Sequence, residues 1–408
     1  MLIYSNNWHT FCCPKVVMEY SIINTREYTL QEFRDIMNAK HPRLQPTLDD
    51  TVAVLPQDTT ISEYVYHYRS TDEHGEPIML SSLMLIPKQG GAFTAERLWL
   101  ENRATQSADK NVPTHNWNIG EVHVLNNQVL VSPDLMSFGA SIHKPICYCH
   151  AGLAARNSVD AVIAAQQILR DLRYVNQPLS VYNSGHSQGG FDALAVHRYM
   201  ETEATEEEKD FFPLERSFCA DGPYTPDIQT QIVLSREKYL YGAYMVMNAM
   251  SHLHYHSDYF EPGITIDDFL TDAAKELQIA SLIEKKEVGN KELVKYVMES
   301  LGTRTSNLFV PDAYLPDGKL YDMVMRCSKA DRLIDGWMPS KPIYFYHAHY
   351  DECVVVECMQ AVKTVWGHLP NVMIDDDLTP IENIPNKMVH AYSGGVFHRR
   401  LLEQRPIM

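Results

Sequence analysis

Ser187 lies in the stretch "YNSGHSQGG" (182–190), where Gly185 and Gly189 stand two residues to either side of it. The apolar run 179–182 predicts a short buried strand before the serine, and the periodicity of 188–200 predicts a helix after it. A strand-to-helix turn this tight admits little more than glycine at the flanking positions, and it presents the serine hydroxyl for attack. Nucleophilic acyl transfer is the chemistry indicated, provided that a base and an acid follow in the chain.

The segments around this turn alternate between strands and helices. Residues 59–88 hold two alternating apolar runs around Asp72–Gly75, which predicts an antiparallel hairpin. Further strands are predicted at 97–103, 129–134, 216–222, 342–346 and 371–374, and helices at 159–175, 357–367 and 394–404. The pair Asn157-Ser158 is the expected N-cap of the first of these helices. This order of elements predicts an α/β fold, a parallel sheet with helices on both faces.

Residues 225–337 interrupt that alternation with mainly helical patterns. Because the sheet resumes after them, we expect a cap inserted into one domain that spans 46–408, preceded by an N-terminal extension at 1–45. The cap begins with a stretch rich in Tyr and Met, "YLYGAYMVMNAMSHLHYHSDYF" (239–260). This stretch could line an apolar substrate pocket with adaptable side chains, or it could be helix core.

The composition excludes several classes of protein. A hydrophobic content of 45% supports a large core, while a formal net charge of −17 disfavours nucleic acid and anionic membranes as partners. The sequence holds no apolar run of the roughly 18–20 residues that cross a bilayer. Residues 1–20 lack a charged segment followed by an apolar core, so they predict no signal peptide, and the cytoplasm is the default location. Cys12-Cys13 follows no apolar stretch, so lipid attachment there is not indicated.

Two groups of residues raise the question of a metal site. Cys147, Cys149 and His150 in "CYCH" could hold an ion, or the thiols could be ordinary buried or loop cysteines. The three histidines of "HLHYH" (252–256) have no carboxylate or cysteine at a helpful spacing in the sequence. We therefore predict neither a metal nor a cofactor.

Four stretches together resemble the α/β-hydrolase superfamily. They are "VLVSPDLMSFGAS" (129–141), "GHSQGG" (185–190), "LIDGWMPSKPIYFYHAHYDECVVV" (333–356) and "HAYSGGVF" (390–397). The chain is most similar to the capped bacterial esterases and secretory-lipase-like enzymes related to the prolyl-oligopeptidase clan, over roughly residues 50–408. The resemblance implies a mostly parallel twisted sheet with an antiparallel N-terminal hairpin, helices on both faces and a mainly helical cap.

The resemblance also implies a catalytic triad of Ser187, Asp351 and His390, in the chain order that this fold uses. The imidazole would take the proton of the serine hydroxyl, and the carboxylate would orient and stabilise that imidazole. Glu352 is the alternative carboxylate because it adjoins Asp351, and His398 is the alternative histidine.

The position of His390 favours it over His398 as the base. His390 follows a loop containing Pro380 and Pro385, and the residues 393–395 (Ser-Gly-Gly) could turn the chain back towards the sheet. We expect His390 on a loop above the carboxyl edge of the sheet, within reach of the serine. His398 would begin a helix, where surface exposure or packing is the expected role.

Two backbone amides would form the oxyanion hole of such an enzyme. The N–H of Gln188, directly after the nucleophile, is one expected donor, and that of Ala104 is the other. Relatives commonly carry a histidine before the second donor, where this chain has Arg103. The chain also has Ala348 and Val355 where the family usually has a glycine and a proline.

These observations predict a serine hydrolase that cleaves small carboxylic esters through an acyl-enzyme intermediate. A serine peptidase of the same clan is one alternative, but it would need an anchor for a peptide amine, and no convincing one stands in the sequence. A non-catalytic binding protein with the same fold is another alternative, although such a protein would be expected to have lost a triad residue. A panel of nitrophenyl esters and aminoacyl anilides separates the three.

Overall fold

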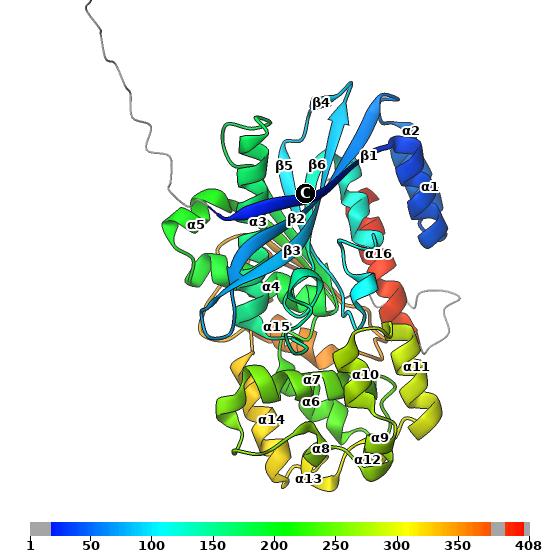
Figure 1. Ribbon diagram of the computed structural model, residues 1–408. Helices are drawn as coiled ribbons and strands as arrows, with labels where there is room; N and C mark the ends of the chain where they lie inside the picture. The colour runs from blue at the N-terminus through cyan, green and yellow to red at the C-terminus, as the bar shows by residue number, and fades with distance from the viewer. Residues whose placement is uncertain (1–17, 377–387, 404–408) are drawn as a thin grey trace, which may run out of the picture.

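The computed structural model describes residues 18–376 and 388–403 (Figure 1). Cys12 and Cys13, the other expectations for residues 1–17, and the loop with Pro380 and Pro385 lie outside the described residues. No described helix is both long enough and apolar enough to cross a membrane.

A ten-stranded sheet forms the centre of the described part of the chain, in the order β1-β2-β3-β6-β5-β7-β8-β9-β10, with β4 paired to β3. Its strands are β1 (Tyr20–Thr29), β2 (Thr59–Thr71), β3 (Pro77–Gln89), β4 (Ala92–Phe93), β5 (Arg97–Asn102), β6 (Gln128–Pro133), β7 (Ser180–His186), β8 (Leu214–Ala220), β9 (Ile343–Tyr346) and β10 (Val372–Asp375). The pairs from β1 to β6 along this order are antiparallel, and those from β6 to β10 are parallel. The predicted mixed sheet with an antiparallel N-terminal hairpin is confirmed.

The β2–β3 hairpin is closed by the turn that the sequence indicated. The carboxylate of Asp72 accepts hydrogen bonds from the backbone N–H groups of His74 and Glu76, at 3.0 Å each. Gly75 has φ +76°, a backbone conformation that strongly favours glycine. The two strands then pair without a break from Thr71↔Pro77 to Thr59↔Gln89.

Helices cover both faces of the sheet. One face packs on α3 (Ala151–Asp171), α4 (Gln188–Thr202), α5 (Glu206–Phe211) and α15 (Val356–Trp366). The other face packs on α1 (Leu30–Lys40), α2 (Gln45–Ala53), η2 (Ile119–Asn126) and α16 (Val389–Glu403). Short turns η1 (Asp109–Asn111) and η3 (Gly139–Ser141) lie in the connections. Side chains of β5 alternate between the two cores: Leu98 and Leu100 enter the first, and Trp99 enters the second.

The chain between β8 and β9 forms a separate group of helices, which gathers at one end of the molecule in Figure 1. They are α6 (Pro226–Ser235), α7 (Gly242–Tyr255), η4 (Ser257–Tyr259), α8 (Ile266–Phe269), α9 (Asp272–Glu276), α10 (Ile279–Lys285), α11 (Asn290–Leu301), α12 (Thr305–Leu308), α13 (Pro311–Tyr314) and α14 (Lys319–Ala330). We call these residues, 226–330, the helical segment. They supply most of one hydrophobic cluster, to which residues outside the segment also contribute: Val112, Phe138, Ile146, Val354, Val355 and Cys358. The division into 1–45 and 46–408 with a cap at 225–337 stays a prediction, and β1 belongs to the same sheet as β2.

The start of α3 differs from the prediction. The helix begins at Ala151 with His150 as its N-cap, one to two turns before Asn157-Ser158. Both of these side chains are buried inside the helix and bond to the sheet: Asn157 Nδ2 donates to Ser70 Oγ at 2.9 Å, and Ser158 Oγ donates to Asn102 Oδ1 at 3.0 Å. Asn and Ser are typical of helix caps, but here they bond to another element. A local sequence pattern cannot tell these two uses apart.

Candidate active site

Ser187 occupies the turn between β7 and α4. Its backbone has φ 62° and ψ −125°, a strained conformation for a residue other than glycine. A Cβ on Gly185 would lie 2.0 Å from the carbonyl oxygen of Gly189, and a Cβ on Gly189 would lie 2.0 Å from that of Asn102. The turn is therefore tight enough to require both glycines, and it places Ser187 at the carboxyl end of the parallel strands, where ligands of open α/β sheets bind.

The three residues predicted as a triad lie together in one chain of hydrogen bonds. His390 Nε2 lies 2.7 Å from Ser187 Oγ, and His390 Nδ1 lies 2.6 Å from Asp351 Oδ2. Asp351 follows β9, and its Oδ1 accepts from the backbone N–H groups of Cys353 and Val354 at 2.8 Å each. Ser187 and His390 are 6% and 7% exposed, so the group is nearly closed to bulk water.

The environment of His390 favours its cationic form. Burial by itself disfavours the charge, but the neighbouring Asp351 carboxylate and its hydrogen bond to Nδ1 favour the charge more strongly. The pKa of His390 is therefore raised well above its ordinary value. An imidazole held this way stabilises the positive charge that it would gain on taking a proton from Ser187.

The sequence suggested that His390 lies on a loop. In the structure it lies in the first turn of α16. Ser393 and Gly394 continue the helix. Ser393 Oγ lies 3.1 Å from His186 Nε2 and donates to the carbonyl oxygen of His390 at 2.8 Å. A Cβ on Gly394 would lie 3.0 Å from His186 Nδ1. The small residues therefore let the helix pass close to His186, and they do not turn the chain back.

The alternative carboxylate, Glu352, has other partners. Its Oε1 accepts from the hydroxyl of Tyr241 at 2.7 Å, and its Oε2 accepts from the backbone N–H of His390 at 3.2 Å. Glu352 thus holds the start of α16 and a tyrosine of the helical segment, while Asp351 bonds to the imidazole ring.

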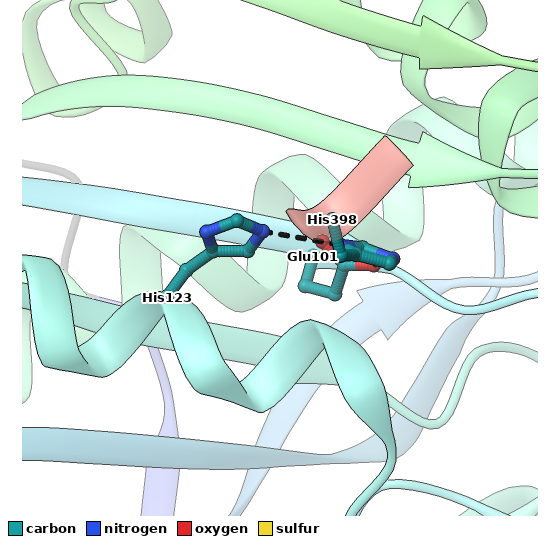
Figure 2. Close-up of side chains that lie close together, drawn as sticks. All are labelled: Glu101, His123 and His398. Atoms are coloured by element: carbon teal, nitrogen blue, oxygen red, sulfur yellow. Dashed lines mark hydrogen bonds and ion pairs between the residues drawn. The ribbon is translucent and has the colours of Figure 1, made fainter. Parts of the chain in front are cut away.

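The alternative histidine, His398, is buried in a different cluster (Figure 2). Its Nδ1 lies 3.0 Å from His123 Nε2, and its Nε2 lies 3.5 Å from Glu101 Oε1. Burial, with further positive charge nearby, lowers the pKa of His398 well below its ordinary value, and burial raises that of Glu101 to about 7. Of the two expected roles for His398, surface exposure and packing, the structure shows packing, because the helix turns this face onto η2 and β5. No local signal in the sequence relates His398 to either partner.

Asp221 and His186 join the site without having been predicted. Asp221 is fully buried directly after β8, where its Oδ1 accepts from the N–H of Ala348 at 2.8 Å and its Oδ2 lies 3.3 Å from His186 Nε2. Burial opposes its charge, but the bond from His186 and the surrounding histidines outweigh burial and lower the pKa of Asp221. The His186 ring lies 4.9 Å from that of His390, centroid to centroid. The signal in the sequence that could have indicated Asp221 was an acidic residue at the end of the predicted strand 216–222.

The loop after β5 lies against the start of α4. The close approach of the Asn102–Arg103 backbone to Gly189 brings this loop beside the Ser187 turn. Arg103 is buried, forms an ion pair of 2.8 Å with the fully buried Glu121, and donates to the carbonyl oxygen of Asn116 at 2.7 Å. Arg103 therefore anchors the loop to η2. The roles of the Gln188 and Ala104 amides stay predictions.

Tyrosines from the helical segment approach His390. The Tyr241 ring lies 6.5 Å from that of His390 and stacks on Tyr244 at 5.5 Å. Tyr239 donates its hydroxyl to the carbonyl oxygen of Cys353 at 2.9 Å. Met245 is buried among the helices, where it helps to line a cavity of about 20 Å³, close to the space of one water molecule. Met245 thus belongs to the helix core, one of the two expectations for this stretch. The expectation of a substrate pocket stays a prediction, although Tyr241 adjoins His390.

The structure separates the two possible metal groups of the sequence. Among the described residues, neither Cys147 nor Cys149 belongs to a set of three or more His, Cys, Asp or Glu ligand atoms within 4.8 Å of one another. His252 and His256 do belong to such a set, with Asp331. The carboxylate that the local sequence lacked comes from the end of α14.

Comparisons with known proteins place this geometry in a known fold. No family model matches the chain, and no curated protein matches it. Solved structures do. A presumed hydrolase from Legionella pneumophila subsp. pneumophila str. Philadelphia 1 superposes with a TM-score of 0.75 at 16% identity, covering 94% of this chain and 98% of that one.

Two further matches are named for their activity. The rice cell wall degrading esterase LipA from Xanthomonas oryzae matches with a TM-score of 0.71 at 19% identity, covering 95% of this chain and 98% of that one. Candida antarctica lipase A matches with a TM-score of 0.58 at 13% identity, covering 88% and 76%. The chain has the α/β-hydrolase fold, as the sequence resemblance implied.

Proposed function

We propose that this protein is a serine hydrolase that cleaves carboxylic esters of small molecules. One observation carries the proposal: Ser187 Oγ, the His390 ring and the Asp351 carboxylate form an unbroken series of contacts of 2.7 and 2.6 Å at a strained turn. The words esterase and lipase in the names of two structural neighbours support ester substrates.

The reaction would run in two acyl-transfer steps. His390 Nε2 takes the hydroxyl proton as Ser187 Oγ attacks the ester carbonyl carbon. The tetrahedral intermediate then collapses, its bond to the leaving oxygen breaks, and protonated His390 donates the proton to the departing alcohol. A water molecule then gives a proton to His390 as its oxygen attacks the acyl-enzyme. When this second intermediate collapses, His390 returns the proton to Ser187 Oγ, and the carboxylic acid and free Ser187 are released. The Asp351 carboxylate, bonded to Nδ1, stabilises the imidazolium in each step.

The negative oxygen of each tetrahedral intermediate needs hydrogen-bond donors. The backbone N–H groups of Gln188 and Ala104 are the proposed pair, one at the first position of α4 and one on the loop that Arg103 anchors. The positive end of the α4 dipole adds to the stabilisation, because Ser187 is its N-cap.

The helical segment acts in this proposal as a cap over the reacting groups. Tyr241 adjoins His390 and bonds to Glu352, while Tyr239 bonds to the loop that carries Asp351. These tyrosines would therefore meet the bound ester and contribute to its selection.

The test is a panel of p-nitrophenyl esters of increasing acyl length beside aminoacyl anilides. We expect ester turnover, and a loss of about a million-fold in kcat in Ser187→Ala at unchanged circular dichroism. Ser235→Ala, a serine on α6 whose hydroxyl bonds only locally, is the matched control and should keep full activity. A fluorophosphonate should label Ser187, which mass spectrometry reads directly.

Other outcomes separate the alternatives. Faster turnover of anilides than of esters would indicate the peptidase. Folded wild-type protein that neither turns over esters nor takes the label would contradict the proposal and favour the non-catalytic binding protein.

A further inference from the structure

We propose that His252, His256 and Asp331 form a binding site for a divalent transition-metal ion, of which zinc is the best match. The site is distinct from the Ser187 group and independent of the proposed ester chemistry. It joins two helices of the helical segment, α7 and α14, at the point where they meet the start of α3.

The spacing of the two histidines suits chelation. They stand four residues apart, His252 in the last turn of α7 and His256 as its C-cap, so their side chains lie close together at the end of the helix. His256 Nε2 lies 2.7 Å from Asp331 Oδ2, and one ligand atom from each of the three residues lies within 4.8 Å of the others. Two imidazoles and one carboxylate are a donor set that zinc accepts, at about 2.0–2.2 Å from each atom.

The surroundings already hold the ligands in position. The Oδ1 of Asp331 accepts from the N–H of Ala151 at 2.8 Å, which leaves Oδ2 directed at His256. The His150 ring stacks on His256 with centroids 4.7 Å apart and planes 6° apart. His252 Nε2 lies 3.3 Å from Ser328 Oγ. A bound ion could take the place of Ser328 at this nitrogen, and the Ser328 hydroxyl could remain as a partner outside the ligands.

Access also favours this cluster. His252 is 1% exposed and closes one side of the proposed site. The side chain of His256 is 12% exposed and lies on the side that faces solvent. An ion can therefore enter from the His256 side and keep one or two water molecules as further ligands. The three protein ligands leave those positions open.

The two other sets of close ligand atoms fit an ion less well. In the Glu101 cluster of Figure 2, His123 and His398 bond to each other at 3.0 Å, and the carboxylate accepts from Trp99 at 3.2 Å and also from Ser184. His123 Nε2, both ring nitrogens of His398 and the Glu101 carboxylate therefore already have partners. The set of Asp221, His347 and Asp351 uses a carboxylate that already bonds to His390.

A bound ion would link the helical segment to α3, a helix that packs on the sheet. Asp331 would connect the ion to the first turn of α3, and the two histidines would connect it to α7. Because the folded chain alone brings these ligands together, the ion should stabilise the folded protein and raise Tm by a few degrees at saturating concentration.

The experiment uses the full chain without a histidine tag, stripped with EDTA and dialysed. After zinc is added back and the excess removed, we expect one zinc ion per chain by elemental analysis. Cobalt(II) in place of zinc should give a visible d–d absorption band, and Tm should rise with zinc and fall back with EDTA. His252→Gln and Asp331→Asn should each abolish the band and weaken zinc binding at least tenfold.

Three control variants should bind normally. His254→Gln alters the histidine between the two proposed ligands, which instead lies 3.1 Å from Glu73. His123→Gln and His347→Gln each alter one of the other two sets. Folded wild-type protein that takes up no zinc would overturn the proposal, and so would a cobalt band lost in His123→Gln or His347→Gln but kept in His252→Gln. Since Asp331→Asn keeps the size of its side chain, it tests the site even if a histidine variant does not fold.

Discussion

His390 and His398 lie on the same helix, yet their rings meet different partners. His390 contacts Ser187 and Asp351, whereas His398 contacts His123 and Glu101 in the core. We expect His390→Ala to lower kcat by about 10⁴-fold or more. His398→Ala should keep the kcat of its folded fraction and lose about 1–3 kcal/mol of stability, because its buried partners lose a hydrogen bond.

Steady-state kinetics and urea unfolding of both variants check this prediction. A dead His398→Ala beside an active His390→Ala would contradict the assignment of the base.

The protonation of His390 gives a second prediction. Only neutral His390 can accept the Ser187 proton, and its pKa is raised because Asp351 outweighs the effect of burial. The kcat/KM for an ester should therefore be highest at alkaline pH and fall as pH drops through a midpoint above the ordinary histidine value of about 6.5. A pH series from 5 to about 9 measures the midpoint, and a midpoint below 6.5 would contradict the raised pKa.

At the level of single residues, the sequence predicted the three side chains that lie together at the candidate site but not those that surround them. Ser187, Asp351 and His390 follow motifs that can be read locally or by resemblance. Asp221 and Arg103 were visible as an acid and a base at strand ends, but their roles depend on His186 and Glu121, which approach only in the folded chain. A partner fixed by tertiary packing leaves no local pattern.

Among the elements, the β7–α4 turn imposes the strictest geometry. A Cβ on Gly189 would lie 2.0 Å from the backbone oxygen of Asn102, an atom that cannot rotate away. We expect Gly189→Ala to destabilise the fold by at least about 2–3 kcal/mol and to abolish turnover. Chemical denaturation and ester turnover are the measurements.

Gly152→Ala is the matched control, since it also adds a methyl group near the start of a helix. Its nearest neighbour would be the His150 ring at 3.6 Å, an ordinary contact, and alanine favours the helix. The control should be neutral or slightly stabilising. Equal stability of the two variants would show that the turn can relax, against the prediction.

Most of the element order was predictable, but β1, α1 and the starts of two helices were not. The alternation of strands and helices gave the sheet and its hairpin. The predicted start of α3 was wrong because Asn157 and Ser158 lie inside the helix and bond to the sheet. The predicted start of α16 was wrong because Ser393 and Gly394 continue the helix and pack it against His186. In both cases, residues typical of helix ends or turns served close packing between elements.

For the whole molecule, the helical segment packs mainly around one hydrophobic core, distinct from the two that flank the sheet, so its unfolding should be largely separable from that of the sheet. Phe269 is buried in that core and Phe191 in the core between the sheet and α3–α4. We expect Phe269→Ala, at a cost of about 3–5 kcal/mol, to speed amide exchange mainly within 226–330. Phe191→Ala should speed exchange throughout the sheet. Hydrogen-exchange mass spectrometry reads both, and equal acceleration of β5 and β7 by Phe269→Ala would contradict separate cores.

The place of the helical segment between β8 and β9 also has a consequence during synthesis. Strand β8 pairs with β7 on one side and with β9 on the other, but residues 221–342 must be translated before β9 exists. At about 5–20 residues per second, the ribosome leaves the open edge of β8 waiting for roughly ten seconds. An unpaired strand edge is a template for wrong pairing. The nascent chain thus passes through a period of exposure to aggregation, and chaperone dependence during expression should concentrate in this interval.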